Sequence, residues 1–344
     1  MREWTSKIAE GAHFSPAEMA LVADQLLSAE PSDESKADFL EAFHARGEKP
    51  EEITALALAF LDKAEPFEAH RDLGPFIDVC VTGGDKLGLF NISTAVMFVV
   101  AGAGVRVIKH GNRGITSRSG GADVLEALGI PIELPHEKLA AMLEGAGATF
   151  LFAPRFHPAF KSIAPARKLL ASRGKASVFN MLGPLLNPAR PERQLAGVFS
   201  PRLVSLYAEI LPDLGRKKAW VVHGRTAQGG VMDEISTLGP TTIAETSGGK
   251  VRQTEFDASG YVSPPESVEP LLGGDAAQNA KILLSLLAGE SKGPARDIVL
   301  INAAAALQAA DTAVGWDEAL AKAAESIDSG AANRVLSEMR RLSA

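Results

Sequence analysis

The stretch that decides the fold runs from Phe76 to Gly111, FIDVCVTGGDKLGLFNISTAVMFVVAGAGVRVIKHG. A β-rich run at 76–81 is followed by a glycine turn, an apolar helical segment and a second β-rich run at 105–108. This alternation is typical of a largely parallel sheet covered by helices. Similar runs at 149–152 and 219–223, and extra strands within 240–262, extend the sheet. The sequence therefore predicts an α/β fold.

The first seventy or so residues predict helices only. Ser15, Pro16 and Glu18 supply an N-cap, a first-turn proline and a capping-box acid, and apolar side chains follow at helical spacing. The region 158–190 has several prolines and no strong strand, so we expect it to join this helical part. The expected architecture is a small discontinuous all-helical domain, 1–72 with about 158–190. It is joined to a large α/β domain, 73–157 and 191–344, with a central mostly parallel sheet flanked by helices.

Composition narrows the class of protein. The 344 residues are 46% hydrophobic and 22% charged, which is ordinary globular usage, and the length favours two structural units. The net charge of -7 gives no general attraction to nucleic acid or anionic membrane, so both are unlikely partners. A single cysteine, Cys80, excludes an internal disulfide and a cysteine-clustered zinc site. With neither a secretory signal nor a membrane-spanning run, we expect a cytoplasmic protein.

The first cluster of residues that could bind a ligand is Thr82-Gly83-Gly84-Asp85, directly after a predicted strand. The segment Asn91-Ile92-Ser93-Thr94 then opens an apolar helix. Glycines let backbone amides approach phosphate oxygens, and a helix N-terminus favours negative charge. An ordinary turn followed by ordinary helix caps explains the same residues about equally well.

A second cluster, from Lys109 to Arg113, follows the next predicted strand and leads through Ser117 into another helix. Lysine and arginine supply charge and donors for phosphate, and the alternative is a solvated turn. Because ligands of open α/β sheets collect at the carboxyl ends of strands, two such loops favour a shared anion site.

The third cluster is the carboxylate pair Asp233-Glu234, within the apolar context VMDEIS. Adjacent carboxylates usually lie in water, but unpaired acids between apolar side chains are costly to bury. Magnesium binds carboxylates together with phosphate oxygens and water. A pair of acids facing a phosphate site therefore suggests a magnesium site, provided that the three clusters meet.

At this point the residues resemble a known family. The run from Asp78 to Gly129 resembles the anthranilate phosphoribosyltransferase pattern of GTGGD, NIST, KHGNR and ADVLEALG. HPA at 157–159 with Arg167, FNMLGPLLNPA at 179–189, and VVHG with DEIS at 221–236 follow in the family's order. The resemblance implies a homodimer formed by the small domain, with an active site at the hinge between the domains. It also implies magnesium-dependent transfer of phosphoribosyl from phosphoribosyl pyrophosphate to anthranilate, releasing pyrophosphate in tryptophan biosynthesis.

The resemblance also assigns residues. Those implied to bind phosphoribosyl pyrophosphate are Thr82, Gly83, Gly84, Asp85, Asn91, Ser93, Thr94, Lys109, Gly111, Asn112, Arg113 and Ser117. Those implied to contact anthranilate are Asn112, Arg167 and Val81, and those implied to hold magnesium are Ser93, Asp233 and Glu234. An aromatic amine is neutral near pH 7 and needs no strong base, so no general base is assigned. Lys109, Asp233 and Glu234 are expected to act electrostatically.

The sequence departs from the family pattern in four places. Val81 replaces the first glycine of GTGGD, where a β-branched residue opposes positive φ and adds bulk. Leu89 replaces a threonine, Gly121 replaces a serine expected to touch phosphate, and the run from Arg167 to Phe179 is about three residues longer than usual. These departures surround the acceptor and leave the donor residues in place, so the resemblance specifies the donor more closely than the acceptor. The alternatives are a paralogue with another aromatic or nitrogen acceptor, a pyrimidine nucleoside phosphorylase, and a non-catalytic nucleic-acid-binding relative.

Overall fold

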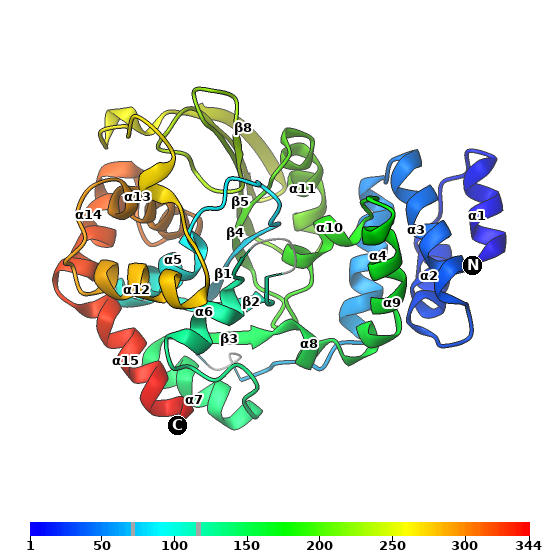
Figure 1. Ribbon diagram of the computed structural model, residues 1–344, viewed down its shortest axis with the longest axis horizontal. Helices are drawn as coiled ribbons and strands as arrows, with labels where there is room; N and C mark the ends of the chain where they lie inside the picture. Colours follow the sequence, from blue (N-terminus) through cyan, green and yellow to red (C-terminus); the bar gives the residue numbers. More distant parts are fainter. Residues whose placement is uncertain (70–72, 115–117) are drawn as a thin grey trace. The chain divides into compact units, whose positions relative to one another are not determined.

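A computed structural model describes residues 1–69, 73–114 and 118–344. The chain forms two compact units (Figure 1): Met1–Pro66 with Ala153–Pro188, and Phe67–Phe152 with Ala189–Ala344. The sequence predicted these boundaries a few residues later in each case. Residues 153–156 belong to the helical unit because the Glu65 N–H donates to the Phe156 carbonyl at 2.8 Å.

The first unit contains only helices. They are α1 (Arg2–Ala9), α2 (Pro16–Leu27), α3 (Asp33–Arg46), α4 (Pro50–Asp62), α8 (Ala153–Phe156), α9 (Ala164–Ser172) and α10 (Phe179–Leu182), with 3-10 turns at Pro158–Ser162 and Gly183–Leu185. The predicted capping box starts α2: Ser15 accepts from the Glu18 N–H, and the Glu18 carboxylate accepts from the Ser15 N–H. Local capping thus sets where this helix begins.

Aromatic packing explains why the two segments of this unit join. Phe60 of α4 meets Phe160 and Phe179 with ring centroids 5.0 and 5.8 Å apart. Lys36, only 1% exposed, donates to the Ser162 carbonyl at 2.9 Å. The later segment therefore completes a core that the first four helices leave open.

The second unit is built on an eight-stranded sheet with strand order β3-β2-β1-β4-β5-β7-β8, with β6 paired to β5. Its strands are β1 (Phe76–Val81), β2 (Arg106–Gly111), β3 (Ala148–Phe152), β4 (Arg193–Gly197), β5 (Lys218–Arg225), β6 (Val231–Met232), β7 (Thr241–Ser247) and β8 (Lys250–Phe256). The first five in the spatial order are parallel and the remaining ones antiparallel. The predicted fold class, an all-helical part with a mostly parallel α/β part, is confirmed.

Helices cover this sheet. They are α5 (Ile92–Gly102), α6 (Gly121–Ala127), α7 (His136–Ala146), α11 (Pro201–Asp213), α12 (Ala276–Leu287), α13 (Pro294–Ala309), α14 (Gly315–Asp328) and α15 (Ala331–Ser343), with 3-10 turns at Ala258–Gly260 and Glu269–Leu271. The helix α11 packs on β5 and β7, and α5 and α13 pack on the central strands. In Figure 1, α5 and α13 lie on the opposite side of the sheet from α11. Within the described ranges, no helix has the length and apolarity needed to cross a membrane.

Candidate active site

The loop after β1 contacts the segment that carries Asp233 and Glu234, called the acidic segment below. The Gly83 N–H donates to Asp233 Oδ2 at 2.7 Å, and Thr82 Oγ1 lies 3.5 Å from the same oxygen. Gly83 and Gly84 have φ of 71° and 113°, which L side chains rarely adopt. The glycine pair therefore turns the chain so that its amide reaches a carboxylate about 150 residues away in sequence.

The first turn of α5 meets the second carboxylate. The Ser93 backbone amide lowers the pKa of the Glu234 carboxylate, which places the two groups near each other, while Lys109 Nζ lies 3.1 Å from Ser93 Oγ and donates to the Val79 carbonyl. Lys109 is 4% exposed, so its ammonium is fixed at the end of β2. The structure thus brings together Ser93, Lys109 and Glu234, which lie far apart in the sequence.

The negative charges of Asp233 and Glu234 are not balanced by the neighbouring protein groups. Burial raises the pKa of Asp233 to about 7, and the nearby Asp85 carboxylate adds to the shift. Burial also raises the pKa of Glu234 well above its ordinary value. The Asp233 charge adds to this, whereas Lys109 and the Ser93 amide oppose it. Burial raises the pKa of Asp85 as well. Three carboxylates thus share a region that disfavours their charges.

A divalent cation would relieve this repulsion. Hard oxygen ligands and excess negative charge fit magnesium, which usually takes one or two carboxylates and completes its shell with phosphate oxygens and water. Over the described part of the chain, no group of three or more His, Cys, Asp or Glu side chains could enclose a metal by itself. The residues therefore suit a cation shared with a phosphate-bearing ligand better than a closed protein site.

Two glycines let the acidic segment lie against the sheet. A Cβ on Gly197, the last residue of β4, would lie 1.6 Å from the Asp233 carbonyl oxygen. A Cβ on Gly224 of β5 would lie 2.4 Å from the Glu234 carbonyl oxygen. Any side chain at either position would displace the acids.

Asn302 fixes the same segment from α13. This side chain is fully buried, accepts from the Ile235 N–H at 2.8 Å and donates to the Ile235 carbonyl at 3.0 Å. Both backbone groups of the residue after Glu234 are thereby satisfied. Asn302 is the polar interruption in the apolar run LINAAAAL, a signal from which the sequence could have indicated a special role.

The loop after β2 is organised by an acid that the sequence reasoning missed. Asp123, at the start of α6, accepts from the N–H groups of Gly114 and Gly120 at 2.8 Å each. Its other oxygen accepts from Arg113 at 3.0 Å, and Arg113 also pairs with Glu126. Partial burial opposes ionisation of Asp123, but these hydrogen bonds and the guanidinium keep its pKa below the ordinary value. Arg113 therefore pairs with two acids of α6, and its contact with phosphate stays a prediction.

The other described residues predicted to bind substrate lie at the start of α5, at the end of β2 and directly after β2. Asn91 is the N-cap of α5, Thr94 is buried in its first turn, and Gly111 ends β2. Asn112 is exposed and accepts from the Arg113 N–H at 2.8 Å. Ser117 lies outside the described residues.

Arg167 belongs to the helical unit and lies on α9, with its guanidinium 4.9 Å from the Phe179 ring centroid. Burial lowers its pKa. The exposed turn at 173–176 provides room for the extra length that the sequence shows after Arg167.

Val81 needs no unusual backbone, contrary to the concern raised by its β-branched side chain. It ends β1 in a regular strand, and positive φ among the described non-glycine residues falls at Lys86, Arg190 and Asp311. Its Cγ1 would lie 3.0 Å from a Cβ on Gly197. Val81 therefore packs over the bare end of β4, beside the acidic segment.

Comparison with known proteins identifies the family. Residues 73–333 match the glycosyl transferase family a/b domain, and residues 2–64 match its helical bundle domain. Anthranilate phosphoribosyltransferase of Rubrobacter xylanophilus is 43% identical over 343 residues, covering 100% of this chain and 97% of the relative. That of Moorella thermoacetica is 44% identical, covering 97% and 96%. The chain belongs to the anthranilate phosphoribosyltransferase family.

Solved structures of this family agree with the assignment. Anthranilate phosphoribosyltransferase from Thermus thermophilus superposes with a TM-score of 0.89 at 38% identity, covering 99% of both chains. The Saccharomyces cerevisiae anthranilate phosphoribosyltransferase in complex with PRPP and Mg gives 0.86 at 26% identity, covering 99% of this chain and 97% of that one. The predicted family membership is confirmed.

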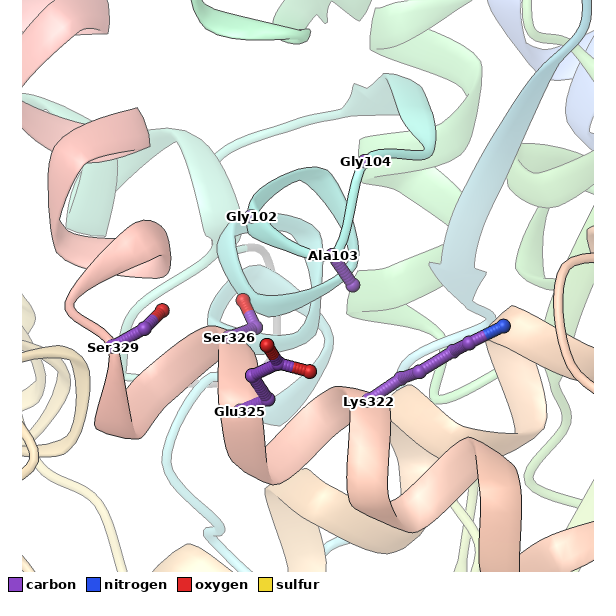
Figure 2. A pocket seen from close by; sticks show the side chains of 7 residues that line it. All are labelled: Gly102, Ala103, Gly104, Lys322, Glu325, Ser326 and Ser329. Carbon is purple, nitrogen blue, oxygen red and sulfur yellow. The ribbon is translucent and has the colours of Figure 1, made fainter.

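One surface pocket of this phosphoribosyltransferase family member lies elsewhere in the large unit. It has a volume of about 370 Å³ and is lined by Gly102, Ala103, Gly104, Lys322, Glu325, Ser326 and Ser329 (Figure 2). Figure 2 shows Ser326 of α14 directed at the end of α5, where its Oγ donates to the Val99 carbonyl at 2.7 Å. None of the residues expected to bind substrate lines it. We interpret the pocket as a gap at the junction of α5 and α14.

Proposed function

We propose that this chain catalyses magnesium-dependent transfer of phosphoribosyl from phosphoribosyl pyrophosphate to anthranilate, with release of pyrophosphate, as a step of tryptophan biosynthesis. The observation that carries the proposal is the meeting of three segments. Gly83 donates to Asp233, Lys109 lies against Ser93, and the Ser93 backbone and Lys109 both lower the pKa of Glu234. Full-length similarity to enzymes of that name supports it.

The chain's own groups suit the charge that develops during this reaction. Breaking the bond between the anomeric carbon and pyrophosphate leaves negative charge on the leaving group and positive charge on the ribose ring. A magnesium ion held by Asp233, Glu234 and Ser93 would supply positive charge at the leaving oxygens. Lys109 and the amides of the Thr82–Asp85 loop add donors that are already in position, so little reorganisation is needed.

The acceptor amine needs positioning more than activation. Arg167 is the residue that we propose to meet the anthranilate carboxylate, because a guanidinium forms paired bonds with a planar carboxylate. Its burial against Phe179 restrains the side chain in advance. We propose Val81 and Asn112 as further contacts of the acceptor.

A direct assay tests the proposal. Purified protein with magnesium and phosphoribosyl pyrophosphate should consume anthranilate fluorescence and release pyrophosphate stoichiometrically. Omission of magnesium should abolish the signal. Failure at high enzyme concentration, together with calorimetric binding of phosphoribosyl pyrophosphate, would leave the donor site and refute the acceptor. The next step would be a screen of other aromatic amines.

Arg167→Ala tests the acceptor contact separately. It should raise KM for anthranilate at least tenfold with little change in KM for phosphoribosyl pyrophosphate, in line with loss of a charged hydrogen bond of about 1.5–3 kcal/mol. The adjacent exposed Lys168→Ala is the matched control. Equal effects of the two variants would contradict the assignment.

Two further parts of the proposal are a homodimer formed through the helical unit and a cytoplasmic location. Light scattering during gel filtration measures the mass of the assembly, and a monomer at micromolar concentration would contradict the first. Fractionation of the source cells tests the second. Phosphorolysis of uridine or thymidine without magnesium would favour a nucleoside phosphorylase instead.

A further inference from the structure

A segment that the sequence analysis left without a role, LLGGDAAQN at 271–279, lies against the candidate site. Leu272 pairs with Leu89 as an antiparallel bridge, the Phe90 N–H donates to the Leu271 carbonyl at 3.0 Å, and the Gly273 N–H donates to the Gly88 carbonyl at 2.8 Å. The chain that joins the glycine turn after β1 to α5 is therefore braced by the residues before α12.

Asn279 is the polar centre of this brace. The residue is 2% exposed, and its Oδ1 accepts from the Gly274 N–H at 2.7 Å. Its Nδ2 donates to Asn91 Oδ1 at 2.8 Å, and Asn91 Nδ2 donates to the Ser119 carbonyl at 3.1 Å. These hydrogen bonds form a relay that ties the start of α12, the N-cap of α5 and the loop after β2 together.

The direction of the relay is fixed by its two ends. A backbone N–H at Gly274 can only donate and a carbonyl at Ser119 can only accept. Each amide between them must therefore present its oxygen toward Gly274 and its nitrogen toward Ser119. No rotation of either asparagine side chain preserves every bond, so the relay holds Asn91 in one orientation.

That orientation has a consequence for the acids. An asparagine at an N-cap usually accepts from the backbone of its own helix, but in the described structure the Asn91 side chain makes no such bond. Its oxygen accepts from Asn279, and the Ser93 backbone amide acts instead on the Glu234 carboxylate, whose pKa it lowers. By binding the Asn91 oxygen, Asn279 thus keeps it away from the N-terminus of α5, where the Glu234 carboxylate lies.

We propose that Asn279 is a positioning residue for the binding of phosphoribosyl pyrophosphate, acting through Asn91 and Ser119. The proposal rests on the proposed function and deepens it. Without the Asn279 donor, the Asn91 oxygen is free to turn onto α5 and compete with Glu234 for the Ser93 N–H. The start of α5 and the loop after β2, which we propose to bind the diphosphate, would then no longer be held in a fixed position relative to each other.

Asn279→Asp is the sharpest test, because it keeps the shape and an acceptor for the Gly274 N–H but removes the donor to Asn91. Calorimetric affinity for phosphoribosyl pyrophosphate with magnesium should fall about tenfold, a size expected for one net hydrogen bond. KM for phosphoribosyl pyrophosphate should rise equally, with KM for anthranilate and kcat within about twofold. Asn279→Ser, which introduces no charge and is too short to reach Asn91, provides the second variant should the first fail to fold.

A double-mutant cycle separates positioning from general stability. In an Asn91→Ala background, Asn279→Asp should change the affinity by less than about twofold, because its effect passes through Asn91. Leu283→Val, a buried change on the same helix, should lower the thermal midpoint without altering affinity.

Three outcomes would overturn the proposal. One is unchanged affinity in both folded Asn279 variants while the wild type binds. Another is an undiminished effect of Asn279→Asp in the Asn91→Ala background. A wild type that does not bind phosphoribosyl pyrophosphate at all would overturn the proposed function together with this role.

Discussion

Two acidic regions of the large unit behave in opposite ways. Asp123 accepts two backbone amides and a guanidinium, and its pKa is lowered. Asp233 and Glu234 are buried beside Asp85, and the pKa of each is raised. The first region is complete without a ligand, whereas the second places charge where the protein alone does not balance it. The difference separates an acid that is satisfied by neighbouring protein groups from the acids that we propose to bind a cation.

The largest effect is expected from Asp233→Asn combined with Glu234→Gln, which removes the two carboxylates whose pKa values are raised. Turnover should fall by more than about a thousandfold, because the groups that stabilise the leaving pyrophosphate would be lost. The thermal midpoint of the ligand-free protein should be unchanged or higher, since unfavourable buried charges disappear. Activity assays and thermal denaturation measure both. A double variant with wild-type rates would refute the cation role.

Asp123→Ala tests the opposite region. It leaves the N–H groups of Gly114 and Gly120 and the Arg113 guanidinium without this partner, so we expect a loss of about 1–3 kcal/mol of stability. Denaturant titration measures the change. Glu126→Gln, which touches only the more exposed end of the same network, is the control and should cost less than about 1 kcal/mol. Equal losses in the two variants would show that Asp123 does not organise the loop.

The pH dependence of stability tests the raised pKa of Asp233. The folded-state pKa of Asp233 is about 7, against an ordinary value of 3.8, so the ligand-free folded state retains its proton more tightly than the unfolded chain. This contribution to stability is fully present below about pH 4 and is lost as pH rises through 7. Between pH 5.5 and 8, the thermal midpoint should fall more steeply in the wild type than in Asp233→Asn. Parallel curves for the two proteins would contradict the assigned titration.

The smallest effect concerns Gly121, which stands where the family pattern has serine. A Cβ there would lie 3.2 Å from Thr94 Oγ1, a buried hydroxyl without a hydrogen-bond partner among the described residues. Gly121→Ser should therefore lower KM for phosphoribosyl pyrophosphate by about threefold or less, and should stabilise the first turn of α6 by about 0.5 kcal/mol. Gly121→Ala provides the control for the helix effect alone. Should the alanine variant gain as much affinity as the serine variant, the hydroxyl has no role.

The sequence could predict those features whose causes are local. Strand runs, the glycine pair at 83–84 and the capping box of α2 depend on neighbouring residues, and the structure contains each of them. The two glycine-containing loops could be expected to meet because the carboxyl ends of parallel strands share an edge of the sheet, whereas the approach of Asp233-Glu234 to them was only a condition.

Other features depend on partners far along the chain. Asn302 and Asn279 read as ordinary polar positions on helices until the structure brings Ile235 and Asn91 to them. Long-range packing decided these roles, and local propensity could not.

The bare ends of β4 and β5 bear on how such an enzyme can diversify. Because Gly197 and Gly224 admit the main chain of the acidic segment, the location of the acids is set by backbone contacts. Side chains such as Val81 can then be exchanged during evolution without moving the acids. A substitution at Val81, the proposed acceptor contact, can therefore change that contact while Asp233 and Glu234 keep their place on the sheet.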